Sequence, residues 1–205
     1  MAEKDARTLV IVAHPDLRGK SRANKRWVEE LERHPEEFVV HDIFAAQRVG
    51  TTGAGAGEPR AFNAQDVARE QALLAAHDLV VFQFPVFWYS CPPLLRAWED
   101  AVYSLGWAYG NPDAQPGEPG RALAGKRFAY AVTAGDIEEH YCATGPVGCT
   151  LDEALTPFRA TAKYLEVAAE PHAFAIYGAD FGLTDEQIAE SAPAYVEWLR
   201  NLRKA

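Results

Sequence analysis

Five short apolar runs punctuate this chain of 205 residues. Four of them are rich in β-branched and aromatic residues, at 9–13, 79–84, 128–133 and 173–177, and a weaker one lies at 38–44. Continuous runs of this kind are typical of strands that are buried on both faces, because helices cover both sides of a parallel sheet. The sequence therefore predicts five parallel strands.

Helical patterns lie between these runs, at 21–33, 64–76, 93–105, 151–165 and 184–202. Pro157 interrupts the fourth and predicts a kink or a late start. The fifth opens with Thr184 followed by Asp, Glu and Gln, which is a capping box. Strand and helix alternate through five repeats. This predicts an α/β fold with a doubly wound, five-stranded parallel sheet in the order 2-1-3-4-5 and helices on both faces.

The composition fits one globular domain, and we expect residues 1–205 to form it. The net charge of -9, without a dense Lys/Arg run, makes nucleic acid and membrane surfaces poor partners, because an acidic chain repels phosphate. Three cysteines are an odd number and indicate free thiols in a reducing cytosol. The apolar run behind the charged N-terminus is too short to span a membrane. We expect a cytoplasmic protein without a metal site.

One stretch has low complexity, the sequence GTTGAGAG at 50–57. Its composition indicates a surface loop after the second strand. A glycine-rich phosphate loop is the weaker alternative, because neither a helix-capping pattern nor a Lys-Ser/Thr ending follows it.

In open α/β sheets a ligand lies beyond the carboxyl ends of the strands, where the strand order switches. After the first strand comes His14, and Ser21, Arg22, Ala23 and Asn24 then open a helix. A helix N-terminus offers unpaired N–H groups and a positive dipole end, so this segment can hold a phosphate monoester. The alternative is an ordinary serine cap beside a histidine that bonds a turn.

An aromatic segment follows the third strand. It consists of Pro85, Val86, Phe87, Trp88 and Tyr89. Three consecutive aromatic residues at a strand tip cannot all face a core, and a flat aromatic surface next to prolines suits a planar tricyclic ring. A hydrophobic dimer contact is the alternative, and both can hold together, since exposed apolar patches usually mark a binding event.

Small residues follow the fourth strand, as Thr133, Ala134, Gly135 and Asp136. Small side chains at a strand tip let the backbone approach a ligand closely, although a plain glycine turn would look the same. The loop continues through His140 and Tyr141.

These segments resemble the NAD(P)H:quinone oxidoreductase family of flavodoxin-like proteins. The resemblance is strongest to its short bacterial branch, which includes general stress oxidoreductases and the ancillary flavoprotein of glutathione-gated potassium efflux systems. It runs from Val10 to about Tyr177. The matching residues are 13–15, 21–24, Glu70, Gln71, 78–85, 88–90, 92–95, Trp98, 106–110 and 133–136.

The resemblance implies a flavin whose phosphate is held by 21–24 and whose isoalloxazine ring lies against 86–89 and 133–136, with His14 nearby. Gln71 matches a position that touches flavin in longer members of the family.

The resemblance also implies a homodimer. Two subunits would build each active site, with Trp107 and Tyr109 covering the flavin of the partner chain.

Two features depart from the family pattern. Ala134 and Asp136 replace the second and fourth residues of a Thr-Thr-Gly-Gly turn, and a carboxylate near the flavin would disfavour an anionic reduced ring. Tyr141 matches a tyrosine that stabilises charge during hydride transfer, but the histidine that accompanies it in the family falls on Val147. His140 is the substitute that this sequence offers.

The resulting hypothesis is an FMN-dependent NAD(P)H oxidoreductase with Tyr141 and His140 as catalytic candidates. NAD(P)H would deliver a hydride to flavin N5, and a quinone or another small acceptor would then take two electrons in the same pocket, in a ping-pong cycle. FMN is favoured over FAD because the short chain lacks an evident segment for an adenosine half, although Gln71 keeps FAD as an alternative.

Two other classes of function compete with this hypothesis. The chain could be an ancillary subunit of a potassium efflux transporter, with redox chemistry incidental. It could also be a one-electron carrier, which fits less well because a carrier needs no roomy aromatic pocket.

Overall fold

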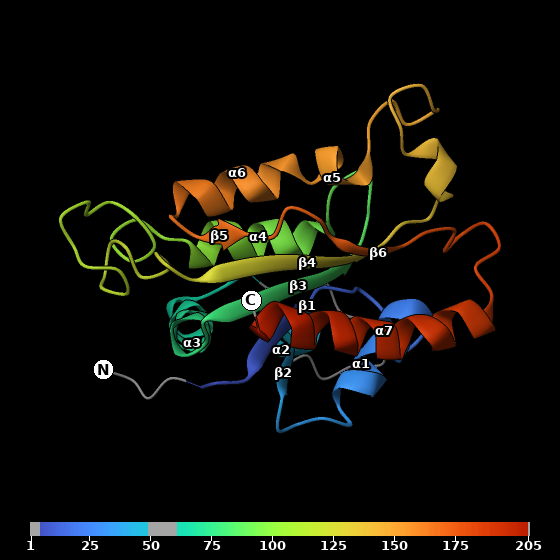
Figure 1. The fold of residues 1–205 in the computed structure, drawn as a ribbon. Coiled ribbons are helices and arrows are strands. Elements are labelled where there is room, and N and C mark those ends of the chain that lie inside the picture. Colours follow the sequence, from blue (N-terminus) through green and yellow to red (C-terminus); the bar gives the residue numbers. More distant parts are fainter. Residues whose placement is uncertain (1–4, 49–60, 205) are drawn as a thin grey trace.

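The computed structural model describes residues 5–48 and 61–204, and these form helices around a central parallel sheet (Figure 1). The strands are β1 (Thr8–Val12), β2 (Phe38–Asp42), β3 (Leu79–Pro85), β4 (Arg127–Thr133), β5 (Ala168–Ala169) and β6 (Phe174–Ile176). Their order is β2-β1-β3-β4-β5, and β6 also pairs with β4. All pairs are parallel, so the predicted 2-1-3-4-5 topology is confirmed.

The edge beyond β4 differs from the prediction of one strand at 173–177. Arg127 and Phe128 at the start of β4 pair with β5, whereas its last three residues pair with β6. The sequence missed β5 because it has only two residues, and Pro171, which has no N–H group to donate, follows it closely. The fifth strand of the predicted sheet is therefore two short pieces.

The helices agree with most of the predicted segments. They are α1 (Ala23–Leu31), α2 (Ile43–Arg48), α3 (Ala64–Ala76), α4 (Pro93–Val102), α5 (Leu151–Ala154), α6 (Thr156–Tyr164) and α7 (Asp185–Lys204), with a 3-10 turn η1 (Glu138–His140). Pro157 does divide the predicted helix at 151–165, with the break at Leu155. The capping box at α7 is also confirmed: the N–H of Gln187 donates to Thr184 Oγ1, and that of Thr184 to Gln187 Oε1.

Several predicted boundaries are wrong by one to three residues, as in the first helix, which spans 23–31 and not 21–33. The strand at 38–44 ends at Asp42, because the carboxylate of Asp42 accepts the N–H groups of Phe44 and Ala45 and so caps α2. The helix at 93–105 ends at Val102, and the next residue, Tyr103, leaves the helical conformation with a ψ of 58°. The predicted loop at 50–57 lies outside the described residues.

The sheet separates two hydrophobic layers, with α4 and α6 on one side and α1 and α7 on the other (Figure 1). Alternate strand residues face opposite layers, as expected of a pleated sheet. Ile11 and its partner Phe82 belong to the first layer, whereas Val10 and its partner Val81 belong to the second.

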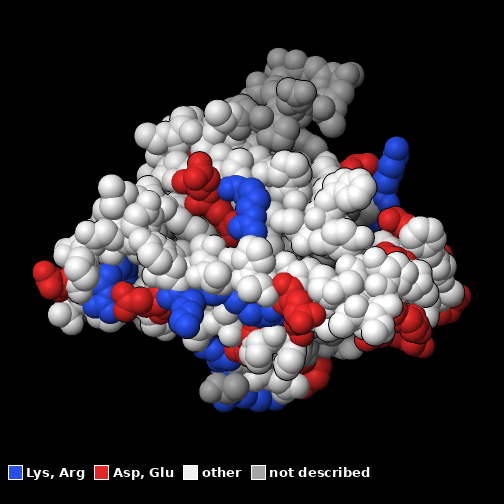
Figure 2. All heavy atoms as spheres, turned by 90° about the horizontal axis from the view of Figure 1, so that it is seen from above, with Lys and Arg blue, Asp and Glu red and all other residues white. Residues whose placement is uncertain are grey.

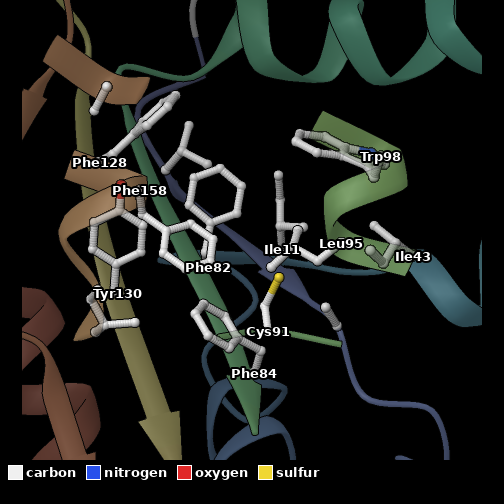
Figure 3. Close-up of a cluster of buried hydrophobic side chains, with 14 of the residues drawn as sticks. Ile11, Ile43, Phe82, Phe84, Cys91, Leu95, Trp98, Phe128, Tyr130 and Phe158 are labelled. Atoms are coloured by element: carbon white, nitrogen blue, oxygen red, sulfur yellow. The ribbon is translucent and has the colours of Figure 1, made fainter. Parts of the chain in front are cut away.

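Aromatic rings fill much of the first layer. Figure 3 shows Phe82 of β3 at its centre, between Tyr130 and Phe128 of β4 and Trp98 of α4. The ring of Phe82 meets that of Phe128 edge-on at 5.1 Å between centroids. This geometry is favourable for aromatic pairs, so the layer holds the strands and α4 in a fixed relation.

A hydrogen bond and ring contacts join the two helices of the second layer. The indole N–H of Trp27 on α1 donates to Ser191 Oγ on α7 at 2.8 Å, and both groups are buried. The Trp27 ring also packs on Tyr195 of α7 and Phe174 of β6. These contacts fix α1 on the sheet, and with it the loop at its N-terminus. In the part of the chain that the structure covers, every helix is too short or too polar to cross a lipid bilayer.

We predict that Ser191→Ala lowers the free energy of unfolding by about 1–3 kcal/mol, because it leaves the buried indole N–H of Trp27 without an acceptor. Urea denaturation measures this change. In a Trp27→Phe background the N–H is absent, so the same substitution should have a much smaller effect. An equal loss in both backgrounds would contradict the assignment.

Candidate functional site

A cavity of about 320 Å³ opens at the carboxyl ends of β1, β3 and β4. This volume lies within the range of small-molecule sites. Its lining includes ten of the residues predicted to bind a cofactor, namely His14, Ser21, Arg22, Ala23, Asn24, Pro85, Val86, Phe87, Thr133 and Gly135. Loops that are far apart in sequence meet here because parallel strands end at the same edge of the sheet.

The N-terminus of α1 forms one end of the cavity. Ser21 Oγ accepts the N–H of Lys25 at 3.3 Å and does not cap the residues before it. The N–H groups of Arg22, Ala23 and Asn24 have no partner among the described residues. Unpaired N–H groups and the helix dipole favour an anion at this position. Lys20 and Arg22 add two cationic side chains to the lining. This end of the cavity suits a phosphate.

His14 lies at the tip of β1 with a fixed tautomer. Its Nδ1 accepts the N–H of Asp16 at 3.0 Å, so the proton of the neutral ring is on Nε2. Burial lowers the pKa of His14 below its ordinary value of 6.5, although the carboxylates of Asp16 and Asp42 oppose this. At neutral pH the ring is therefore uncharged and has one N–H group to donate to a ligand.

The aromatic segment after β3 forms a tight turn. The N–H and carbonyl groups of Phe87 and Ser90 bond each other in both directions at 3.0 Å. The two residues between them, Trp88 and Tyr89, have φ angles of 49° and 60°. This is a type I′ arrangement, which usually contains Asn and Gly. Trp88 is 92% exposed. Two bulky residues in a left-handed conformation, one of them in solvent, indicate a surface kept for binding.

The turn after β4 is held by the loop that follows β6. Backbone N–H groups of Ala179 and Asp180 donate to the carbonyls of Ala134 and Gly135. A Cβ on Gly135 would lie 2.3 Å from a carboxylate oxygen of Asp180, so a larger residue at this position would require the exposed side chain of Asp180 to move. Ala134 is fully buried beneath the turn, and Gly135 lines the cavity.

Asp136 is not part of this lining, and its carboxylate is hydrogen-bonded to neighbouring residues of its own loop. Its carboxylate accepts the N–H of Ile137 and pairs with Nδ1 of His140 at 2.8 Å. Both hydrogen bonds hold the pKa of Asp136 below its ordinary value, and the bond from His140 has the larger effect. His140 thus faces this carboxylate through one nitrogen and keeps Nε2 available.

Tyr141 connects this loop to the aromatic turn. Its ring lies 6.4 Å from that of Tyr89 and 5.4 Å from that of Tyr177, measured between centroids. Burial is the main cause that raises the pKa of Tyr141, and the neighbouring Tyr89, Asp136 and Cys149 add to it. Tyr141 is therefore a neutral phenol at physiological pH, but neither Tyr141 nor His140 is part of the cavity lining.

The structure does not bring Gln71 to the cavity. Its amide donates to the carbonyl of Val102 and the hydroxyl of Ser104, at 2.9 and 3.0 Å, and so fixes the segment after α4. Sequence reasoning missed five lining residues, which are Lys20, Ala179, Asp180, Leu183 and Ile188. The small residues of 178–182, after β6, are a signal of the same kind as those at 133–136 and could have identified this loop.

We predict that Trp88→Asn raises the free energy of unfolding by about 1 kcal/mol, because asparagine tolerates the left-handed conformation and Trp88 buries little surface. Chemical denaturation measures the change. Phe181→Asn is the matched control, since Phe181 is also exposed, at 69%, but does not have a positive φ. A Trp88→Asn protein of unchanged or lower stability would show that the turn is not strained.

The family model for the flavodoxin-like fold matches residues 6–199. Among curated proteins, the NAD(P)H oxidoreductase YdeQ of Bacillus subtilis is 39% identical over 196 residues, which cover 96% of this chain and 87% of that protein. The glutathione-regulated potassium-efflux system ancillary protein KefG of Salmonella paratyphi C is 33% identical, with 96% and 94% covered.

A solved structure with a similar fold is general stress protein 14 of Treponema denticola in complex with FMN. It has a TM-score of 0.79 and 35% identity, and the match covers 96% of this chain and 99% of the other. Fold, topology and sequence thus agree, and the chain belongs to the flavodoxin-like family of NAD(P)H oxidoreductases.

Proposed function

We propose that this chain binds FMN in the cavity at the sheet edge and uses it to oxidise NAD(P)H with a quinone-type acceptor. The observation that carries the proposal is the convergence of the α1 N-terminus, His14 and the aromatic turn on one cavity. The FMN complex of the Treponema denticola protein and the name of the Bacillus subtilis relative support it.

The residues around the cavity fit the parts of FMN. The phosphate would lie against the free N–H groups of 22–24, with Lys20 balancing its charge, whereas the guanidinium of Arg22 is paired with Asp185 at 2.7 Å. The flat ring system would rest on Val86, Phe87, Thr133 and Gly135, where a glycine lets the backbone come close.

The chemistry divides between the cofactor and the chain. Bound FMN would accept a hydride from NAD(P)H and pass two electrons to the acceptor, in two half-reactions that share one pocket. The chain would orient both partners on the aromatic turn. The phenol of Tyr141 would donate a hydrogen bond to the charge that develops, because its raised pKa keeps its proton in place.

The carboxylate of Asp136, which departs from the family turn, is compatible with this proposal because of its local contacts. Asp136 is held by His140 and does not line the cavity, so the repulsion expected between this carboxylate and a reduced ring is weakened. His140 is positioned by the same contact and is the candidate for moving a proton.

FMN remains favoured over FAD. A role as an ancillary subunit of a potassium efflux system is the second candidate, and the similarity to the Salmonella paratyphi C protein favours it. In that role the same site would bind flavin, but turnover would be incidental.

We further propose that two copies of the chain associate through the face that carries α4, α6 and the 105–110 loop. Leu105 is 72% exposed and Tyr164 is 70% exposed, and the Tyr164 ring contacts that of Tyr109. Figure 2, which looks down on the side of α5 and α6, shows wide uncharged areas between small mixed groups of acidic and basic side chains. Gln71 supports the start of the same loop, so its family role fits a contact with the partner's cofactor.

The first test is the absorbance spectrum of the purified protein and the mass of the compound that heat releases. We expect a yellow protein that releases FMN, is bleached by NAD(P)H without oxygen and is reoxidised by a quinone. Phe87→Ala should weaken FMN binding about tenfold, because Phe87 lines the cavity and its truncation removes an aromatic contact to the ring. A protein that stays colourless with added FMN and FAD would refute the proposal, and flavin binding without turnover would favour the ancillary role.

The dimer is tested by sedimentation equilibrium. Leu105→Asp should shift the protein from dimer to monomer, because it places a charge on the apolar contact. Phe181→Asp is the matched control, since Phe181 is also exposed, at 69%, but lies on the loop after β6. Association that is unchanged in Leu105→Asp, or lost equally in both variants, would contradict this face.

A further inference from the structure

A buried amide lies directly beneath the cavity and is not part of its lining. Gln83 is on β3, the strand between β1 and β4, and its side chain is completely inaccessible. Its neighbours in sequence, Phe82 and Phe84, face the layer of α4 and α6, so Gln83 faces α1. Burial of an amide in a central strand costs free energy unless its polar atoms form hydrogen bonds within the protein.

The amide of Gln83 meets two acceptors of one residue. Its Nε2 lies 3.1 Å from the carbonyl oxygen of Asn24 and 3.2 Å from Asn24 Oδ1. A flipped amide would place an oxygen against the Asn24 carbonyl, so the NH2 group must face α1. Gln83 Oε1 has no hydrogen-bond partner in the described part of the chain, which is consistent with a geometry chosen for its donors.

This orientation fixes the next two groups in turn. Because Asn24 Oδ1 accepts from Gln83, the Asn24 nitrogen faces the other way and donates to Thr133 Oγ1 at 2.9 Å. The Thr133 oxygen is thus an acceptor within the chain, and its own hydrogen is left for another partner. Asn24 and Thr133 both line the cavity, and in the described part of the chain the second N–H of Asn24 and the O–H of Thr133 have no hydrogen-bond partner.

We infer that Gln83 is a positioning residue that, acting through Asn24 and Thr133, makes this wall of the cavity a hydrogen-bond donor to acceptor atoms of the cofactor. The three side chains come from β3, the first turn of α1 and the end of β4. Without the Gln83 amide, Asn24 can rotate and accept from Thr133, and the wall would then present lone pairs to the cofactor's oxygen and nitrogen acceptors. The inference rests on the proposed binding of FMN.

The test is a double-mutant cycle on the affinity of the apoprotein for FMN, followed by quenching of flavin fluorescence. Gln83→Met has a similar volume and cannot donate, and it should weaken binding about tenfold. In a Thr133→Val background, which lacks the hydroxyl, the same change should weaken binding less than about threefold. Thr133→Ser keeps the hydroxyl and is the matched control, in which the tenfold loss should remain.

A role of Gln83 in stability alone would give the same loss of FMN affinity in all three backgrounds, and that result would overturn the inference while the proposed function stands. Unchanged affinity in Gln83→Met would do the same. Failure of the wild-type protein to bind FMN would contradict both the inference about Gln83 and the proposed function. Circular dichroism of each apoprotein checks that it is folded. If Gln83→Met is not folded, Gln83→Asn replaces it, because its shorter amide cannot reach Asn24.

Discussion

The parallel pairing of β1, β3 and β4 is the constraint on which the rest of this molecule depends. In register, Val12 lies beside Gln83, and Pro85 lies beside Thr133, so the three strands end at one edge. Most groups of the site are attached to one of these ends or to the helix that follows β1, and the others come from the loop after β6 and the start of α7. The pairing, and not any single side chain, brings together a helix N-terminus, an aromatic turn and a small-residue turn.

In such a sheet the central strands are buried, so a polar side chain on them must find its hydrogen-bond partners within the protein and not in water. The hydrophobic layers surround β3 on both faces, and Gln83 is the polar residue in its otherwise apolar run. Its hydrogen bonds lead toward the cavity through Asn24 and Thr133. Core and site are therefore continuous here, and the packing of α1 through Trp27 also decides where the N-terminus of α1 lies in the cavity wall.

Much of the fold could be predicted because it depends on patterns that are local in sequence. Runs of apolar residues indicated β1, β3 and β4, and the proline at 157 indicated the break between α5 and α6. The start of α2 was mistaken for strand because Ile43 and Phe44 are apolar, and the cap supplied by Asp42 was not recognised. The two-residue β5 is defined by pairing with β4, which no local pattern contains.

The candidate site was predictable where loops follow long strands, and less so elsewhere. Asp180 was missed because β6 has three residues and gives a weak signal, although its loop holds Gly135 in place. The pairing of Asp136 with His140 could not be predicted either, because it depends on the 3-10 turn η1, which brings the two side chains together. Gln71 was assigned to the flavin by resemblance, whereas within one chain it fixes the end of α4.

The turn from Phe87 to Ser90 closes on itself through two mutual hydrogen bonds, and at its tip Trp88 is almost wholly in solvent, whereas the ring of Tyr89 packs against that of Tyr141. The side chain of Trp88 is consequently almost independent of the sheet beneath it. A change at Trp88 would alter the shape and chemistry that this surface presents to an incoming molecule, while the strands, the hydrophobic layers and the cavity stayed as they are. The fold thus separates a surface side chain that is free to vary from the strands and layers that hold the cavity together.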